Sequence, residues 1–237
     1  FSLSTKYSYS IYRIGTFAAI DQTSASGNTV AYINNTQHSV DIGPTFTFDG
    51  GDTLFFKYNY TIGESKPENT GPTLNYVFQT IAPEYETKTL VPGWTLTISG
   101  GGTLVEQVGN RVFMSGKLGL ATDYDRRTHV EMSVSRQAVP SFFATSSSLI
   151  SNVARFNVTY GFSRLVRLTA GADYAYSETA PVKTFAYRTV RGSVALDYSL
   201  TESTTVSLSQ EDTYYERTGV LPYDRYATML TLKTEWR

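Results

Sequence analysis

The sequence predicts an all-β chain that forms one antiparallel meander of strands closed into a barrel. Apolar residues recur at every second position over long stretches, and no segment keeps the spacing of an amphipathic helix. Turn signals rich in Gly, Pro, Asn and Asp interrupt this alternation about every 20 residues. Short and long connections alternate along the chain, which a barrel built of hairpins explains because all its short turns lie at one end.

The hairpin predicted at residues 37–63 shows the alternation most clearly. Its turn is DGGD at 49–52, a sequence typical of a tight connection. Polar residues separate the apolar ones on both arms, so one face is apolar and the other polar. The apolar positions are His38, Val40, Ile42, Pro44, Phe46, Phe48, Leu54, Phe56, Tyr58, Tyr60 and Ile62.

Repeating this reading from turn to turn predicts about twelve strands in a single domain, residues 1–237. No linker or charge block divides the chain, and strand spacing begins at Phe1, which favours a further segment upstream. The predicted strands are 1–21, 36–48, 52–63, 73–89, 93–102, 111–124, 127–139, 150–162, 165–178, 184–199, 203–217 and 225–237. The tight connections are 49–52, 90–93, 123–127, 162–164 and 200–203, and the looser ones are 22–35, 63–72, 100–110, 138–148, 177–183 and 217–224.

Composition excludes several other classes of protein. Charged residues make up 17% of the chain and the net charge is −1, without a basic run, so we expect no nucleic-acid partner. The absence of cysteine argues against a small disulfide-bonded scaffold. No apolar run is long enough for a membrane helix, but a membrane strand escapes that test because its apolar residues alternate with polar ones.

The apolar face could meet lipid or form the core of a soluble protein. The hairpin meander favours lipid, and so do small residues on the polar face, such as Gly43, Gly119, Gly161 and Gly171, which suit a crowded barrel interior. Aromatic residues beside the short turns, where a membrane-interface girdle belongs, are Trp94, Tyr160, Phe162, Tyr198 and Trp236.

The end of the chain, RYATMLTLKTEWR, resembles the C-terminal assembly signal of bacterial outer-membrane β-barrels. Leu230, Leu232 and Trp236 fit its alternation, Thr234 fits weakly, and Arg237 departs from it. The segment QEDTYYERTGVLPYDRYATMLTL also resembles β-barrel porins associated with exopolysaccharide export. The resemblance implies a bacterial outer-membrane location, with lipid around the barrel and with the short turns and both termini in the periplasm.

Charged residues of both signs alternate along the polar face from strand to strand. They could form an eyelet that selects a polar or charged solute, or pair with one another and hold the barrel shut, and the balance of signs favours pairing. Twelve strands predict a narrow lumen, partly occluded by Phe55, Phe113, Phe185 and Tyr187. The predicted lumen-lining charged residues are Asp41, Lys57, Glu84, Glu86, Lys117, Glu131, Arg155, Asp173, Arg191, Glu211 and Lys233.

Other chemistry finds little support in the sequence. The two histidines, His38 and His129, belong to no catalytic arrangement, so we expect no enzyme, and no ligand cluster predicts a metal or a cofactor. SGGGT at 99–103 lacks the lysine of a phosphate loop and predicts a flexible loop or bulge.

The function predicted is a non-enzymatic, porin-like channel for small polar solutes or polysaccharide. One alternative is an outer-membrane anchor or scaffold with an occluded lumen, whose loops at 22–35, 63–72 and 138–148 bind envelope proteins. A second alternative is a secreted, soluble β-sandwich that binds a ligand.

Overall fold

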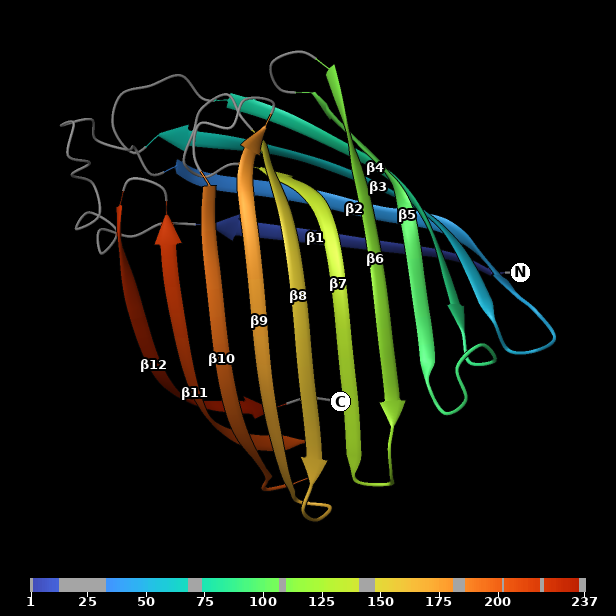
Figure 1. Cartoon of the computed structure of the whole chain (residues 1–237), viewed down its shortest axis with the longest axis vertical. Helices are drawn as coiled ribbons and strands as arrows, with labels where there is room; N and C mark the ends of the chain where they lie inside the picture. The colour runs from blue at the N-terminus through green and yellow to red at the C-terminus, as the bar shows by residue number, and fades with distance from the viewer. Residues whose placement is uncertain are drawn as a thin grey trace.

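The structure, a computed structural model, describes residues 2–12, 33–67, 74–106, 110–140, 148–180, 186–201, 203–217 and 220–234. Within these ranges the chain forms one twelve-stranded sheet whose strands follow one another in sequence order (Figure 1). The strands are β1 (Ser2–Tyr12), β2 (Ile33–Thr47), β3 (Thr53–Pro67), β4 (Leu74–Thr87), β5 (Thr95–Glu106), β6 (Asn110–Asp123), β7 (Thr128–Pro140), β8 (Ser148–Gly161), β9 (Val166–Ala180), β10 (Ala186–Ser199), β11 (Thr204–Arg217) and β12 (Val220–Thr234).

Each strand pairs antiparallel with the next one along the chain, so the sheet is a hairpin meander without a crossover. The all-β meander predicted from the sequence is therefore confirmed, and the described residues form no second sheet that could pack on the first as in a β-sandwich. Figure 1 shows that the sheet twists and curls, with β2–β4 passing behind β6–β10 in that view. Among the described residues no ladder joins β12 to β1, so closure of the sheet into a barrel remains a prediction.

The predicted strands all exist, but two predicted loose connections were wrong. The segment at 100–110 belongs largely to strands, because β5 continues to Glu106 and β6 begins at Asn110. SGGGT is thus part of β5 and not a loop, since glycine can occupy a strand where another backbone comes close. At 217–224, β11 continues to Arg217 and β12 begins at Val220. The first predicted strand, 1–21, is described only as far as Tyr12.

Two of the tight turns use glycine where φ is positive. Gly51, with φ of 83°, lies inside the turn that is closed by the 2.9 Å hydrogen bond from the Phe48 amide to the Asp52 carbonyl. Gly93, with φ of 78°, has the same role between β4 and β5. Left-handed backbone is readily adopted by glycine, which lacks a Cβ atom, so these turns explain the DGGD and LVPG sequences.

Aspartates brace two of these short turns. The Asp125 carboxylate accepts hydrogen bonds of 2.7 Å from the backbone amides of Arg127 and Thr128, and the bond from Arg127 lowers its pKa. Asp52 accepts a 2.7 Å bond from the Tyr85 hydroxyl, which lowers the pKa of the Asp52 carboxyl. Both side chains therefore stabilise their turns in the ionised form.

The ladders have gaps at two prolines, and a glycine lies beside each gap. Pairing between β2 and β3 lapses at Gly43 and Pro44, and pairing between β4 and β5 lapses at Ala82 and Pro83. Proline has no amide proton to donate to a neighbouring strand. A Cβ atom added to Gly43 or Gly101 would lie only 1.9 or 1.8 Å from a carbonyl oxygen of the neighbouring strand. Glycine at these points lets the strands approach closely as the sheet curls.

The register defines two faces with opposite chemistry. We call the face that carries Asp41, Asn59 and Asp173 the inner face, and the face that carries Val40, Phe156 and Leu196 the outer face. Polar residues of the inner face are strongly buried: Thr61 is 6% exposed, Thr103 2% and Ser177 0%. Large apolar residues of the outer face are exposed: Ile81 63%, Met114 80% and Leu230 75%. A flat single sheet would expose both faces equally, so the curl of the sheet must shield the polar face.

The described residues form a small apolar cluster on the inner face. Tyr76, Phe78 and Val105 are 1–4% exposed, and Phe113 packs against them. The ring of Tyr76 covers Gly63, its partner in the ladder, because a Cβ atom there would lie 2.2 Å from the tyrosine oxygen. These residues lie in the halves of β4, β5 and β6 that are remote from the short turns.

Candidate functional site

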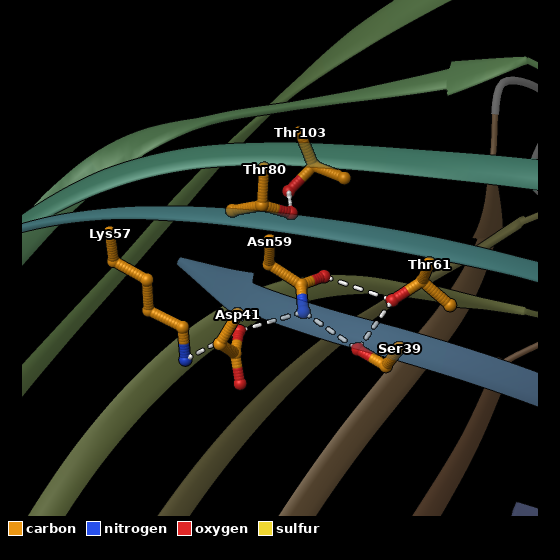
Figure 2. Close-up of polar contacts among 7 residues, drawn as sticks. All are labelled: Ser39, Asp41, Lys57, Asn59, Thr61, Thr80 and Thr103. Atoms are coloured by element: carbon orange, nitrogen blue, oxygen red, sulfur yellow. Dashed lines mark hydrogen bonds and ion pairs between the residues drawn. The ribbon is translucent and has the colours of Figure 1, made fainter. Parts of the chain in front are cut away.

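A network of hydroxyl, amide and charged groups covers the inner face of β2–β5 (Figure 2). The amide nitrogen of Asn59 donates to the Ser39 hydroxyl at 2.7 Å and to the Asp41 carboxylate at 2.8 Å. The Thr61 hydroxyl donates to the amide oxygen of Asn59 at 2.9 Å, and Thr80 bonds Thr103 at 2.9 Å. Each of these polar groups is buried or half-buried and has a partner, so the network costs little desolvation and ties neighbouring strands together.

The ammonium of Lys57 lies 3.4 Å from the Asp41 carboxylate at the edge of this network. Lys57 lies level with Gly43, in the gap of the ladder between the pairs Ile42–Tyr58 and Thr45–Phe55, and Gly43 has no side chain, so the lysine can reach Asp41 diagonally on β2. The predicted neighbours Asp41 and Lys57 do lie together on one face.

A second charged group, which we call the arginine strip, crosses the inner face of β8–β12. It consists of Arg155, Asp173, Arg191, Glu211 and Arg225. Asp173 lies between the two arginines in the register: it is 3.8 Å from Arg155 and forms a close pair with Arg191. Arg191 also reaches Glu211 at 3.6 Å, and the Thr213 hydroxyl donates to Glu211 at 3.2 Å.

The other predicted charged residues also belong to the inner face by register. Glu84 and Glu86 on β4 are half-buried, whereas Lys117 on β6, Glu131 on β7 and Lys233 on β12 are exposed. Within the described part of the chain no ion pair within 4.0 Å joins Glu84, Lys117 and Glu131 to one another. The expected alternation therefore produces contacts in two groups, and no continuous ring of pairs among the described residues.

Several further charged residues of the inner face were missed, among them Arg111, Arg167, Asp197 and Arg225. Arg111, Arg167 and Arg225 are exposed, and Asp197 accepts a 2.6 Å hydrogen bond from Ser207. The predicted set covered one height above the short turns. Arg111, Arg167 and Asp197 lie higher or lower, whereas Arg225 lies in the register row of Arg191, at the first position of the last predicted strand. Counting every second residue along the whole length of each strand would have included these four residues.

The outer face carries an apolar belt that begins at the short turns. The charged outer-face residues nearest to those turns are Arg136 and Asp212, about eight residues or roughly 26 Å along a strand. Below them the outer face is uncharged on β2–β12, and exposed Leu90, Leu165 and Leu200 extend it into the turns. At the usual strand tilt of about 35–45° this length spans roughly 18–21 Å across a membrane, and the apolar turns bring it close to the height of about 25 Å typical of a membrane barrel.

Polar pairs mark the upper limit of this belt. Arg188 pairs with Glu216 at 3.2 Å, and Arg136 donates to Asn152 at 3.0 Å. The Tyr176 hydroxyl donates to Glu178 at 3.1 Å on the same side. These polar residues of the outer face were not predicted, because they lie near the strand ends remote from the short turns.

The predicted girdle aromatics differ in their surroundings. Tyr160 and Phe162 form an edge-to-face pair with ring centroids 4.9 Å apart, and Tyr198 is 45% exposed on the outer face. Trp94 is half-buried and lines a cavity of about 290 Å³ at the short-turn rim, together with Lys88, Thr122 and His129. Trp236 lies outside the described residues, as does Phe185 of the predicted occluding set.

Three residues predicted to narrow the lumen are on the inner face. Phe55 and Tyr187 are half-buried there, and Phe113 packs against the apolar cluster of Tyr76, Phe78 and Val105. The two histidines stand apart: His38 is on the outer face, and His129 bonds Asp123 at 2.8 Å near a short turn.

Neither a metal cluster nor a membrane helix is found in the part of the chain that the structure describes. No three His, Cys, Asp or Glu residues within it come together as metal ligands. No helix within it has the length and apolar character needed to cross a membrane.

No protein-family model matches this chain, and no curated protein sequence matches it. Among solved structures it is similar to one titled "NanC porin structure in rhombohedral crystal form". The two chains are 12% identical, and the match covers 88% of this chain and 96% of the other, with a TM-score of 0.40.

Proposed function

We propose that this chain is a bacterial outer-membrane β-barrel in which β12 closes against β1 and the inner face lines an aqueous lumen. The observation that carries the proposal is the inverted exposure of the two faces. Ser and Thr are shielded while Phe156, Leu196 and Leu230 are 43–75% exposed. In water, an apolar face of this extent would drive aggregation. Lipid accepts such a face, and closure satisfies the free edges of the first and last strands.

The function that this architecture supports best is a non-enzymatic, porin-like channel for small polar solutes. Hydroxyl groups and ionised side chains line the inner face, which gives a permeating solute hydrogen-bonding partners in place of water. The pair of His129 and Asp123 is bonded to no serine or cysteine among the described residues, so it offers no nucleophile. The short turns and both termini are proposed to face the periplasm.

Planar-bilayer recording of the refolded chain tests this function. A channel predicts steady, ohmic conductance steps after insertion. The same sample must show a heat-dependent shift of mobility in detergent gels, because a folded barrel resists detergent until it is boiled. A chain that stays soluble without detergent and shows no mobility shift would overturn the barrel itself.

A second candidate function, an anchor with an occluded lumen, is favoured by one observation. The apolar cluster of Tyr76, Phe78 and Val105 with Phe113 fills part of the inner face away from the short turns. If this cluster closes the lumen, a folded and inserted chain will be silent, and Phe78→Ala will restore conductance. If the lumen is open, Phe78→Ala will change the conductance only slightly.

A further inference from the structure

Apart from His129 and Asp123 at the short-turn rim, the ion pairs of the inner face expose their cations to solvent more than their anions. In the arginine strip the side chains of Arg155 and Arg191 are 60% and 44% exposed, whereas that of Asp173 is 16% exposed. Glu211, the other partner of Arg191, is 28% exposed. At the opposite end of the sheet, Lys57 is 39% and Asp41 24% exposed.

Chain geometry produces this asymmetry. Asp is short and stays beside the backbone, while Arg and Lys carry their charge at the end of a long side chain that extends past the carboxylate. Formal balance between the signs therefore does not make the accessible surface neutral. A solute that approaches the inner face meets guanidinium groups first.

Charges outside the pairs follow the same trend. Thr213 on β11 pairs with Arg191 on one side and with Arg225 on the other. Arg225 is exposed and makes no ion pair within the described residues. Arg167 is exposed as well, while its register partner Asp197 is half-buried and bonded to Ser207. Glu131 is an exposed exception on β7.

Stability does not require this arrangement. Ion pairs that solvent can reach contribute only about 0–1 kcal/mol each. Guanidinium groups, on the other hand, match carboxylates and other oxyanions with two parallel hydrogen bonds. A row of guanidinium groups along one wall lets an anionic solute pass from one hydrogen-bonding partner to the next as it moves through the lumen.

We propose that the lumen selects anions and that the arginine strip, through Arg155, Arg191 and Arg225, is the binding wall for carboxylate-bearing solutes. This inference rests on the proposed channel function and adds a selectivity for anions to it. Asp173 and Glu211 are positioning residues: they hold Arg191 extended across the wall without cancelling the charge that a solute meets.

The test is the reversal potential of the inserted chain in a tenfold gradient of KCl, followed by block with sodium citrate. The unaltered chain is expected to pass chloride over potassium, and citrate is expected to reduce the chloride current. Arg225→Gln, which breaks no ion pair of the described residues, should lower the chloride-to-potassium permeability ratio about sevenfold, because one unit charge roughly 7 Å away in water favours chloride and disfavours potassium by about threefold each. Arg155→Gln should lower it similarly and weaken the citrate block.

Arg136→Gln is the matched control because it removes the same charge from the outer face. It should leave the reversal potential unchanged. A conducting chain that prefers potassium, or whose selectivity is unaffected by Arg155→Gln and Arg225→Gln, overturns the anion inference and leaves the channel intact. Silence of a folded, inserted chain overturns the channel itself, so the two failures can be told apart.

Discussion

Replacing Gly101 by alanine is expected to prevent the sheet from assembling. A Cβ atom at this position would lie 1.8 Å from the Ile81 carbonyl oxygen and 2.8 Å from the Ala82 Cα, and neither belongs to a side chain that could rotate away. The strands would have to separate by more than 1 Å, so the cost should exceed the roughly 1–3 kcal/mol of ordinary overpacking. The measurement is the fraction of refolded chain that migrates as the heat-modifiable species.

Gly100→Ala is the control for this substitution. It differs by one position, and a Cβ atom there would have no neighbour within 4 Å. It should fold as well as the unaltered chain or better, because alanine loses less backbone entropy than glycine. Gly43→Ala should behave like Gly101→Ala, since its Cβ atom would lie 1.9 Å from the Phe56 carbonyl oxygen. Equal folding of the Gly100 and Gly101 variants would show that β4 and β5 do not approach as closely as described.

Phe156→Arg is expected to cause the second large loss. Phe156 is 45% exposed near the middle of the apolar belt, with Met132 and Ala172 beside it in the register. In lipid, an arginine at that depth should cost about 2–4 kcal/mol, measured as the free energy of unfolding in vesicles. If the outer face met water instead, the same change would be neutral and would improve solubility.

Asn157→Arg provides the comparison on the inner face. It lies next to Phe156 in the chain and beside Glu131 in the register, so the new charge would meet an aqueous lumen and a carboxylate. Its unfolding free energy should stay within about 1 kcal/mol of the unaltered chain. Phe156→Leu separates loss of the ring from the effect of the charge. A reversed ranking of Phe156→Arg and Asn157→Arg would mean that the faces are assigned the wrong way round.

The sequence predicted the strands and their faces well because period two is a local property. In the stretch 37–63, for example, alternation alone places Val40 and Tyr60 on one face and Asp41 and Asn59 on the other, as the ladder confirms. Strand ends were predicted less well. The three glycines at 100–102 are typical of a loop, and only the close approach of β4 explains why β5 continues through them.

The charged site could be predicted only in part. Sequence order shows which residues share the inner face, so the pairing of Asp41 with Lys57 and of Asp173 with Arg191 was within reach. The exposure of each charged group could not be predicted, because it depends on side-chain length and on the curl of the sheet. For that reason the balance of signs suggested a neutral wall, whereas Arg155 is far more exposed than Asp173.

The central claim, that the polar face lines water and the apolar face meets lipid, is tested most directly by single-cysteine labelling along β10. The chain contains no cysteine, so each introduced thiol is unique. In vesicles, a charged, water-soluble thiol reagent should label cysteines at Ser193 and Ala195 and spare those at Val194 and Leu196, while a dye at the latter two should be quenched by brominated lipid. Labelling without this alternation, or with the two sets exchanged, would contradict the account.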